Sequence, residues 1–139
     1  VDVELEHDQV AVKGVLTTAH KNGVKVVMSN HDFEQTPSQA EQVARLTAMA
    51  DLGADVAKVA SMPQSPADVL TVLAATVEAK AKLNLPIITM SMGDLGKVSR
   101  VSGQAFGSAL TFAAVGKTSA PGQIGLADLR RDLADLKIN

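Results

Sequence analysis

The stretch Val24-Lys25-Val26-Val27-Met28-Ser29 is a short β-branched run with a helical pattern on each side of it. Upstream, apolar residues recur at helical spacing over residues 9–22, and Gly23 suits the position just after a helix end. Downstream, Thr36 and Pro37 predict the N-cap and the first residue of a helix over 36–52. Residues 56–60 then return to a mostly apolar strand pattern. This alternation of helix and strand is typical of an α/β protein.

The same alternation runs through the whole chain. Strands are predicted to start near residues 1, 24, 55, 86 and 109, a spacing of about 27 residues that is close to the ~30 of one βα unit. The later elements are strands over 87–90 and 109–115 and helices from Ser65-Pro66 to before Pro86, over 98–103 and over 126–136. Two parallel-sheet architectures remain open: a small open doubly wound sheet, or part of a (β/α)8 barrel, which needs about 250 residues.

Composition excludes several classes of function. The 139 residues carry a net charge of −2, which provides no broad cationic surface for nucleic acid, and they include neither Tyr nor Trp for base stacking. The absence of Cys excludes disulfides, zinc–thiolate sites and thiol nucleophiles, and it fits a reducing cytoplasm. No apolar run approaches the ~18–20 residues of a membrane span. We therefore expect a cytoplasmic domain that binds neither nucleic acid nor membrane.

Two residues stand out as candidates for catalysis. Lys58 interrupts an otherwise apolar strand, and burial disfavours the ammonium form of a lysine relative to the nucleophilic amine. Alternatively, Lys58 reaches solvent at a strand end or pairs with Asp55. His31 directly follows the strand over 24–29, where an imidazole can act as a general acid or base near neutral pH. Alternatively, this histidine caps or packs the loop.

Three further polar residues follow later strands. Arg100 can offer a planar fork to a carboxylate, or it can form a salt bridge on a helix surface. Ser119 and Gln123 lie in a Gly/Pro/Ser loop that could be a flexible lid or a plain turn. Since all five candidates lie at or after the C-terminal half of a predicted strand, they share the face of the sheet where active sites of parallel α/β proteins occur.

The sequence contains no metal or nucleotide motif. Three His without acids at ligand spacing give no metal signature, and neither GxGxxG nor GxxxxGKS/T is present. His20 suits a helix C-terminus, where a cation is favourable, and His7 is left undecided, with a structural role favoured. We therefore expect no metal and no cofactor.

Four stretches together carry a family resemblance. They are Val27 to Phe33 with Thr36-Pro37, Lys58 to Asp68 (KVASMPQSPAD), Ile88 to Met92 with Ser99-Arg100, and Phe106 to Ser108 with Ser119 to Gln123. In this order and spacing they resemble type I 3-dehydroquinase (3-dehydroquinate dehydratase), a Schiff-base lyase of the shikimate pathway. The resemblance covers nearly all of the chain.

The resemblance implies a (β/α)8 TIM barrel, of which residues 1–139 would be the C-terminal part, roughly strands four to eight with their helices. Lys58 would form an imine with the ketone of the substrate 3-dehydroquinate, and His31 would transfer protons. Arg100 would hold the substrate carboxylate, while Ser119 and Gln123 would belong to the closing loop. No cofactor is implied, and the full-length protein is expected to be a homodimer.

The chain departs from the family in length. The family has roughly 100 further residues at its N-terminus, as a whole barrel requires. That part is expected to supply three strands, the acid that orients His31, and further substrate-binding Arg and Glu residues. Two other hypotheses remain open. One is a class I aldolase, which uses a similar lysine imine to break a C–C bond, and the other is an inactive fragment that needs its N-terminal part.

Overall fold

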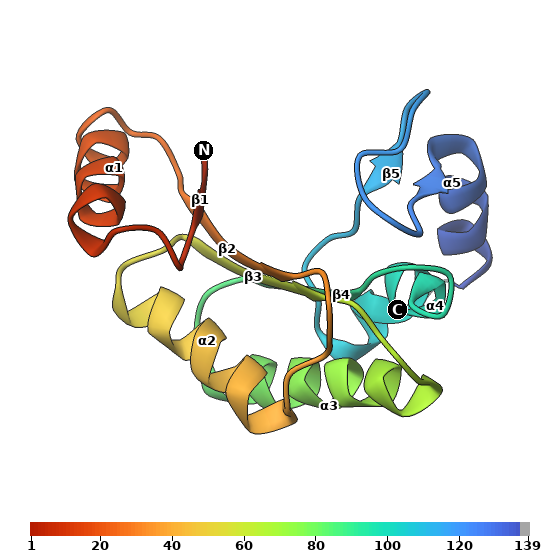
Figure 1. The fold of residues 1–139 in the computed structure, drawn as a ribbon. Coiled ribbons are helices and arrows are strands. Elements are labelled where there is room, and N and C mark those ends of the chain that lie inside the picture. The colour runs from red at the N-terminus through yellow and green to blue at the C-terminus, as the bar shows by residue number, and fades with distance from the viewer. Residues whose placement is uncertain (137–139) are drawn as a thin grey trace.

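The computed structural model describes residues 1–136 and has an α/β fold (Figure 1). Within these residues, β1 to β4 form one parallel sheet in the order β1-β2-β3-β4. The predicted α/β class and parallel sheet are therefore confirmed. The elements are β1 (Asp2–Glu4), α1 (Gln9–Lys21), β2 (Val27–Asp32), α2 (Gln39–Asp51), β3 (Val56–Ser61), α3 (Pro66–Lys82), β4 (Ile87–Ser91), α4 (Lys97–Phe106), β5 (Ala113–Ala114), β6 (Ile124–Gly125) and α5 (Leu126–Asp135).

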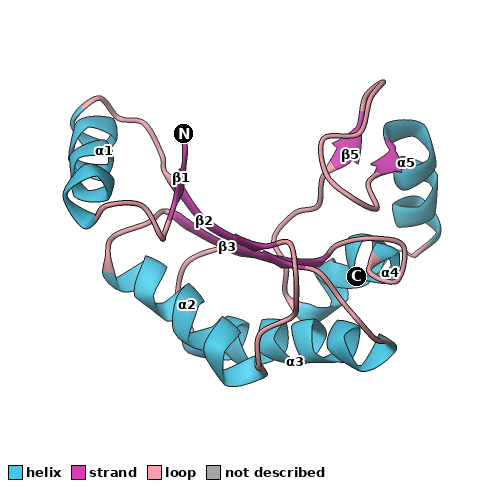
Figure 2. Ribbon diagram, in the orientation of Figure 1, coloured by secondary structure: helices cyan, strands magenta, loops and turns pink. Residues whose placement is uncertain are grey.

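The two faces of the sheet have different surroundings. Helices α2 and α3 both cover the same face, while α1 lies beyond its β1 end and α4 and α5 beyond its β4 end (Figure 2). The covered face contributes Met28, Ala57, Val59 and Ile87 to the main hydrophobic core. Because successive strand residues point to opposite faces, Ser29, His31 and Lys58 lie on the face that α2 and α3 do not cover.

Hydrogen bonds to side chains at the N-termini fix where α2 and α3 begin. The hydroxyl of Ser38 accepts a hydrogen bond from the backbone N–H of Glu41, so α2 begins at Gln39 rather than at the predicted Pro37. Thr36, the predicted N-cap, instead donates its hydroxyl hydrogen to the carbonyl of Met62 at 3.0 Å. The predicted start of α3 at Pro66 is confirmed, and the carboxylate of Asp68 accepts the backbone N–H of Ser65 at 3.0 Å.

The predicted fifth strand over 109–115 is largely wrong. Backbone pairing with β4 is limited to one hydrogen bond, from Ala109 N to Ile87 O at 2.7 Å. The next donor on that edge, Thr89 N, is taken by the hydroxyl of Ser108 at 3.2 Å. This hydrogen bond to a side chain takes the place of a backbone hydrogen bond between strands, so the segment after Ala109 separates from the edge of β4. Only Ala113–Ala114 is a strand, and it pairs with Ile124–Gly125 in a separate two-stranded sheet.

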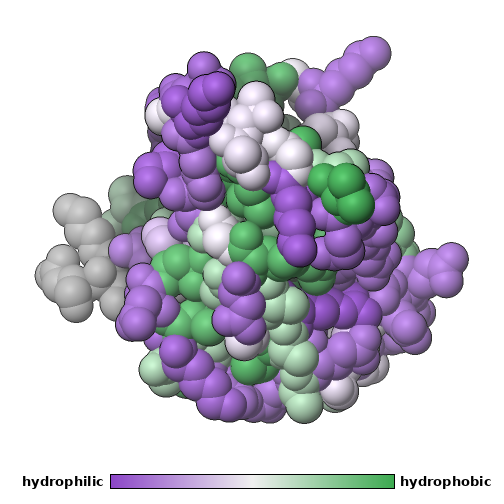
Figure 3. All heavy atoms as spheres, turned by 90° about the vertical axis from the view of Figure 1, so that its left-hand side faces the viewer, coloured by the Kyte–Doolittle hydropathy of each residue, from purple (hydrophilic) through white to green (hydrophobic). Residues whose placement is uncertain are grey.

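The end of the sheet at β1 carries an apolar groove. The groove has a volume of about 530 Å³ and is lined by Val1, Ala11, Gly14, Val15, Thr18, Ala19, Asn22 and Val24. Figure 3 views the molecule from this end and shows hydrophobic side chains among the hydrophilic ones. In the described part of the chain, no helix is both long enough and apolar enough to cross a membrane.

Candidate active site

Lys58 lies in the middle of β3, opposite Ser29 of β2 and Ile88 of β4. It is 8% exposed, which excludes a lysine that reaches freely into solvent. Its Nζ lies 2.9 Å from Nε2 of His31, 4.0 Å from a carboxylate oxygen of Asp2, and 5.1 Å from the ring centroid of Phe112. The lysine is thus a buried amine with an imidazole as its hydrogen-bond partner.

Asp55, the alternative partner considered for Lys58, is engaged elsewhere. Its carboxylate accepts hydrogen bonds from Lys25 Nζ and Val26 N, each at 2.8 Å, and lies 2.8 Å from His20 Nε2. These contacts, that with Lys25 above all, hold the pKa of Asp55 well below its usual range. His20 therefore belongs to an ion-pair cluster at the N-terminal end of β3, away from Lys58.

His31 is held on both of its ring nitrogens. It is part of β2 itself rather than of the loop after it, and its Nε2 faces Lys58. Its Nδ1 contacts the carboxylate of Glu4 on the neighbouring strand β1. The ring also stacks on Phe33, with 5.7 Å between the ring centroids. A carboxylate on Nδ1 fixes the orientation of an imidazole and supports its protonated form.

Glu4 and Asp2 are not among the predicted site residues, and the expectation that the acid partner of His31 lies outside this chain is wrong, because Glu4 contacts His31 Nδ1. The signal was present in the alternation Val1-Asp2-Val3-Glu4-Leu5, which places both acids on one face of β1. Asp2 also accepts a hydrogen bond from the hydroxyl of Ser29 at 2.5 Å. Both acids therefore lie beside the lysine and the histidine.

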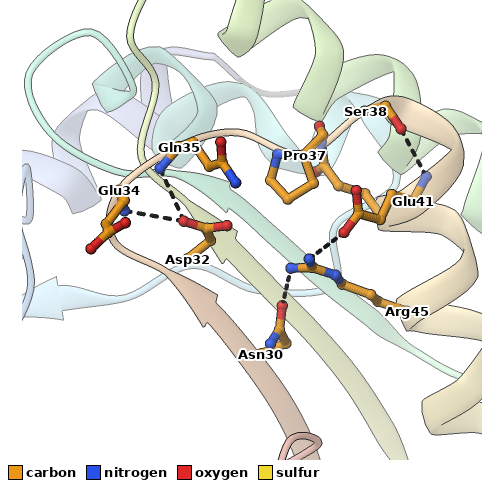
Figure 4. Close-up of polar contacts among 9 residues, drawn as sticks. Asn30, Asp32, Glu34, Gln35, Pro37, Ser38, Glu41 and Arg45 are labelled. Atoms are coloured by element: carbon orange, nitrogen blue, oxygen red, sulfur yellow. Dashed lines mark hydrogen bonds and ion pairs between the residues drawn. The ribbon is translucent and has the colours of Figure 1, made fainter.

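Contacts on the other side of β2 fix the backbone on either side of His31 (Figure 4). Asn30 accepts a hydrogen bond of 2.6 Å from Nη1 of Arg45 on α2, and Nη2 of Arg45 binds Glu41. At the end of the strand, Asp32 accepts the backbone N–H groups of Glu34 and Gln35 at 3.1 and 2.9 Å. These bonds anchor the two neighbours of His31.

Arg100 is a buried cation on α4. It is 2% exposed, which excludes the surface salt bridge considered for it. Its Nη2 donates to the carbonyl of Pro121 at 2.9 Å, its Nη1 lies 3.5 Å from the sulfur of Met90, and its Nε has no hydrogen-bond partner. Burial lowers the pKa of Arg100. Within residues 1–136 no carboxylate pairs with it. A buried guanidinium in this state favours an anionic ligand.

Ser119 and Gln123 bind each other in the loop between β5 and β6. The side-chain oxygen of Gln123 accepts the backbone N–H of Ser119 at 2.7 Å, and its amide nitrogen donates to the Ser119 hydroxyl at 3.0 Å. The loop touches the segment after β4, where Gly93 N donates to Pro121 O at 3.2 Å. The second half of the loop is therefore in contact with the site, while residues 115–119 are exposed.

One cavity of about 200 Å³ brings together all five residues singled out in the sequence. Its lining consists of His31, Lys58, Ala60, Met90, Met92, Arg100, Phe112, Ser119, Ala120 and Gln123. Cationic and hydrogen-bonding groups converge on a space with methionine and alanine walls, as is typical of a small-molecule site. Among the described residues, no group of three or more His, Asp or Glu side chains is arranged to hold a metal ion.

Comparison with known proteins points to one family. The family model for type I 3-dehydroquinase matches residues 1–139. A 3-dehydroquinate dehydratase of Lactiplantibacillus plantarum is 61% identical over 100% of this chain and 55% of its own length. The crystal structure of 3-dehydroquinate dehydratase from Geobacillus kaustophilus superposes with a TM-score of 0.95 and 44% identity, covering 98% of this chain and 52% of its own.

A type I 3-dehydroquinate dehydratase from Clostridium difficile, with covalent modified comenic acid, gives a TM-score of 0.92 and 50% identity. That match covers 97% of this chain and 54% of the other. The present chain thus spans about half the length of the relatives it matches. From the family match over its whole length, the chain belongs to the type I 3-dehydroquinase family.

Proposed function

We propose that this chain carries the central catalytic residues of a type I 3-dehydroquinate dehydratase, a hydro-lyase of the shikimate pathway that converts 3-dehydroquinate to 3-dehydroshikimate and water. The observation that carries the proposal is the 2.9 Å contact between Lys58 Nζ and His31 Nε2 in the cavity that also contains Arg100. Amine, imidazole and guanidinium match a substrate that has a ketone, a β-hydroxyl and a carboxylate.

The first step joins the substrate to Lys58. The neutral amine attacks the ring ketone to give a carbinolamine, which takes up a proton and loses water to leave a protonated imine. His31, within hydrogen-bond distance of the amine, is placed to carry protons in this step. The Asp2 carboxylate, 4.0 Å from Lys58 Nζ, lies where it can balance the positive charge of the imine.

The second step eliminates water from the ring. The cationic imine withdraws electrons, so His31 can take a proton from the neighbouring carbon and leave an enamine. The enamine pushes out the β-hydroxyl, which takes the proton from His31 and leaves as water. The contact of Glu4 with Nδ1 supports the protonated imidazole between these two transfers. Hydrolysis of the conjugated imine then releases 3-dehydroshikimate and restores the amine of Lys58.

Arg100 would hold the substrate through its carboxylate. Its buried guanidinium has an unused Nε and no acidic partner among residues 1–136, so a carboxylate entering the cavity would compensate its charge. Fixing the carboxylate orients the ring, so that the acidic C–H and the leaving hydroxyl both face His31. Ser119 and Gln123 would bind substrate hydroxyls from the loop above.

We further propose that residues 1–139 supply strands four to eight of a (β/α)8 barrel in a cytoplasmic homodimer. Strand order follows chain order from β1 to β4, and α2 and α3 lie on the same face (Figure 2). This arrangement supports a barrel over a doubly wound sheet, whose strand order reverses and whose helices cover both faces.

Borohydride trapping tests the proposed function. Incubation of this chain, completed with the N-terminal part of the Lactiplantibacillus plantarum relative, with 3-dehydroquinate and borohydride should add the mass of the reduced ligand to the peptide that contains Lys58, because hydride reduces the imine to a stable amine. Lys58→Ala should abolish the adduct, and the matched control Lys97→Ala, on the exposed surface of α4, should retain it. An adduct on Lys97 or Lys117, or none at all, would contradict the proposal.

A further inference from the structure

The loop between β5 and β6 lies directly on the backbone that follows β4. Gly122 has a φ of 73°, and a Cβ at this position would lie 2.2 Å from the carbonyl oxygen of Gly93 and 3.0 Å from its nitrogen. These contacts are with backbone, which cannot move aside as a flexible side chain can. Any residue other than glycine at position 122 would therefore separate the loop from Gly93.

One carbonyl connects this contact to the cavity. The oxygen of Pro121 accepts hydrogen bonds from Gly93 N at 3.2 Å and from Nη2 of Arg100 at 2.9 Å. Arg100 thus touches the loop with one nitrogen while its guanidinium lines the cavity. Ser119 and Gln123, on either side of Pro121, line the same cavity. Loop position and guanidinium orientation are therefore linked through a single acceptor.

We infer that the loop between β5 and β6 is a lid that closes by packing Gly122 against Gly93, a contact called here the lid seat. The Pro121 carbonyl couples the closed, or seated, lid to carboxylate binding by Arg100. This inference rests on the proposed function and assigns Gly122 as a positioning residue. A carboxylate on Arg100 fixes the guanidinium in the orientation that also binds Pro121. The seated lid in turn holds Arg100, Ser119 and Gln123 toward the ligand. Since coupling between two equilibria is reciprocal, unseating the lid must weaken carboxylate binding.

The same loop offers a matched control at Gly116. Gly116 also has a positive φ, 80°, but a Cβ there would meet no atom within 4 Å. Gly116→Ala and Gly122→Ala therefore share the backbone strain of a left-handed alanine, and only Gly122→Ala collides with Gly93. Differences in KM and in proteolysis between the two variants therefore measure the effect of the contact between Gly122 and Gly93, and not the effect of backbone strain.

Kinetics and proteolysis together test the inference, each on this chain completed with the N-terminal part of the Lactiplantibacillus plantarum relative. Relative to Gly116→Ala, Gly122→Ala should raise KM for 3-dehydroquinate about tenfold, within the roughly 5–150-fold range of such couplings, with a smaller change in kcat. Quinate, which has the carboxylate but no ketone, should slow tryptic cleavage after Lys117 in the parent and in Gly116→Ala but not in Gly122→Ala. Borohydride trapping on Lys58 at saturating 3-dehydroquinate should persist in both variants and shows that each is folded.

The outcomes separate the inference from the proposed function. If the parent traps no ligand on Lys58, the proposed function fails. If the parent traps ligand and the two variants share the same KM and the same quinate protection, the lid seat is wrong. Loss of trapping in Gly122→Ala alone would also overturn the inference, because it would place Gly122 in the chemistry rather than in lid positioning.

Discussion

Nζ of Lys58 and Nε2 of His31 lie 2.9 Å apart although they belong to different strands. In the parallel register Lys58 is opposite Ser29, two residues before His31, so both side chains emerge on the same face of the sheet. At this distance a proton can pass directly between imidazole and amine. The histidine is therefore within reach of the reacting amine for the proton transfers that follow attack on the ketone.

Replacing His31 with Ala should separate imine formation from elimination. We expect the His31→Ala protein to retain the borohydride adduct on Lys58, while turnover falls by ~10²–10⁴-fold, the usual contribution of a general acid–base group. His20→Ala is the control, because His20 binds Asp55 away from the cavity. Turnover of His31→Ala within about tenfold of the parent, measured by 3-dehydroshikimate absorbance, would show that His31 is not the base.

Replacing Glu4 with Gln should lower turnover as His31→Ala does, but by a smaller factor. The amide keeps the size of the side chain but removes the charge that supports a protonated His31. We expect kcat to fall about tenfold or more, yet less than in His31→Ala, because the imidazole is still present. Glu6→Gln removes the same charge from an exposed position two residues away and should leave kcat unchanged. Equal kcat in the two variants would exclude Glu4 as the orienting acid.

The sequence predicted the residues of the cavity better than their surroundings. Lys58 stands out because it interrupts an apolar run, and His31 because it follows one. Both signals can be seen within the sequence of a single strand. The contact of His31 with Glu4 depends on pairing between β1 and β2, which no local pattern encodes. The burial of Arg100 is equally non-local, since it requires the loop that carries Pro121 to fold back over α4.

The predicted and observed boundaries of elements differ where two local sequence signals compete. Thr36-Pro37 and Ser38 both resemble a helix start, and Ser38 prevails because the Thr36 hydroxyl binds Met62 from the end of β3. The predicted strand over 109–115 has suitable β-branched and aromatic residues. It fails to pair because Ser108 occupies the donor on β4 that the ladder would use.

The cluster around Asp55 should make stability depend on pH. Hydrogen bonds from Lys25, Val26 and His20 lower the pKa of Asp55 in the folded chain. The folded state therefore holds its proton less tightly than the unfolded state, so the stabilisation is complete above the ordinary carboxyl pKa of about 3.9 and is lost as pH falls toward the folded value. Asp55→Asn should lower the free energy of unfolding by about 1 kcal/mol at pH 7.

Urea titrations at several pH values check this prediction. The difference between parent and Asp55→Asn should narrow progressively below about pH 5. Asp51→Asn is the control, because Asp51 is exposed at the C-terminal end of α2, where a negative charge is slightly unfavourable. A difference between parent and Asp55→Asn that stays constant from pH 7 to pH 3 would mean that Asp55 does not act through its charge.

The last prediction concerns the 139-residue chain by itself. The outer edge of β1 has no strand beside it among residues 1–136, and next to it lies the apolar groove of about 530 Å³ that Val1, Val15 and Val24 help to line. Open strand edges and apolar grooves favour association with other chains. We therefore expect this chain alone to form oligomers or aggregates in a sizing experiment and to show little dehydratase activity.

Supplying the N-terminal part of a relative should reverse both properties. The roughly 100 residues expected before the first strand would pair with β1, cover the groove beside α1 and complete the substrate site of the barrel. The N-terminal part of the Lactiplantibacillus plantarum relative, added as a separate chain or joined to Val1, should yield a defined species and raise 3-dehydroshikimate production. The same complement with Lys58→Ala in this chain should give no activity, which assigns the restored turnover to this site. A monomeric 139-residue chain that turns over 3-dehydroquinate as fast as the complemented protein would show that four paired strands suffice, and the barrel proposal would be wrong.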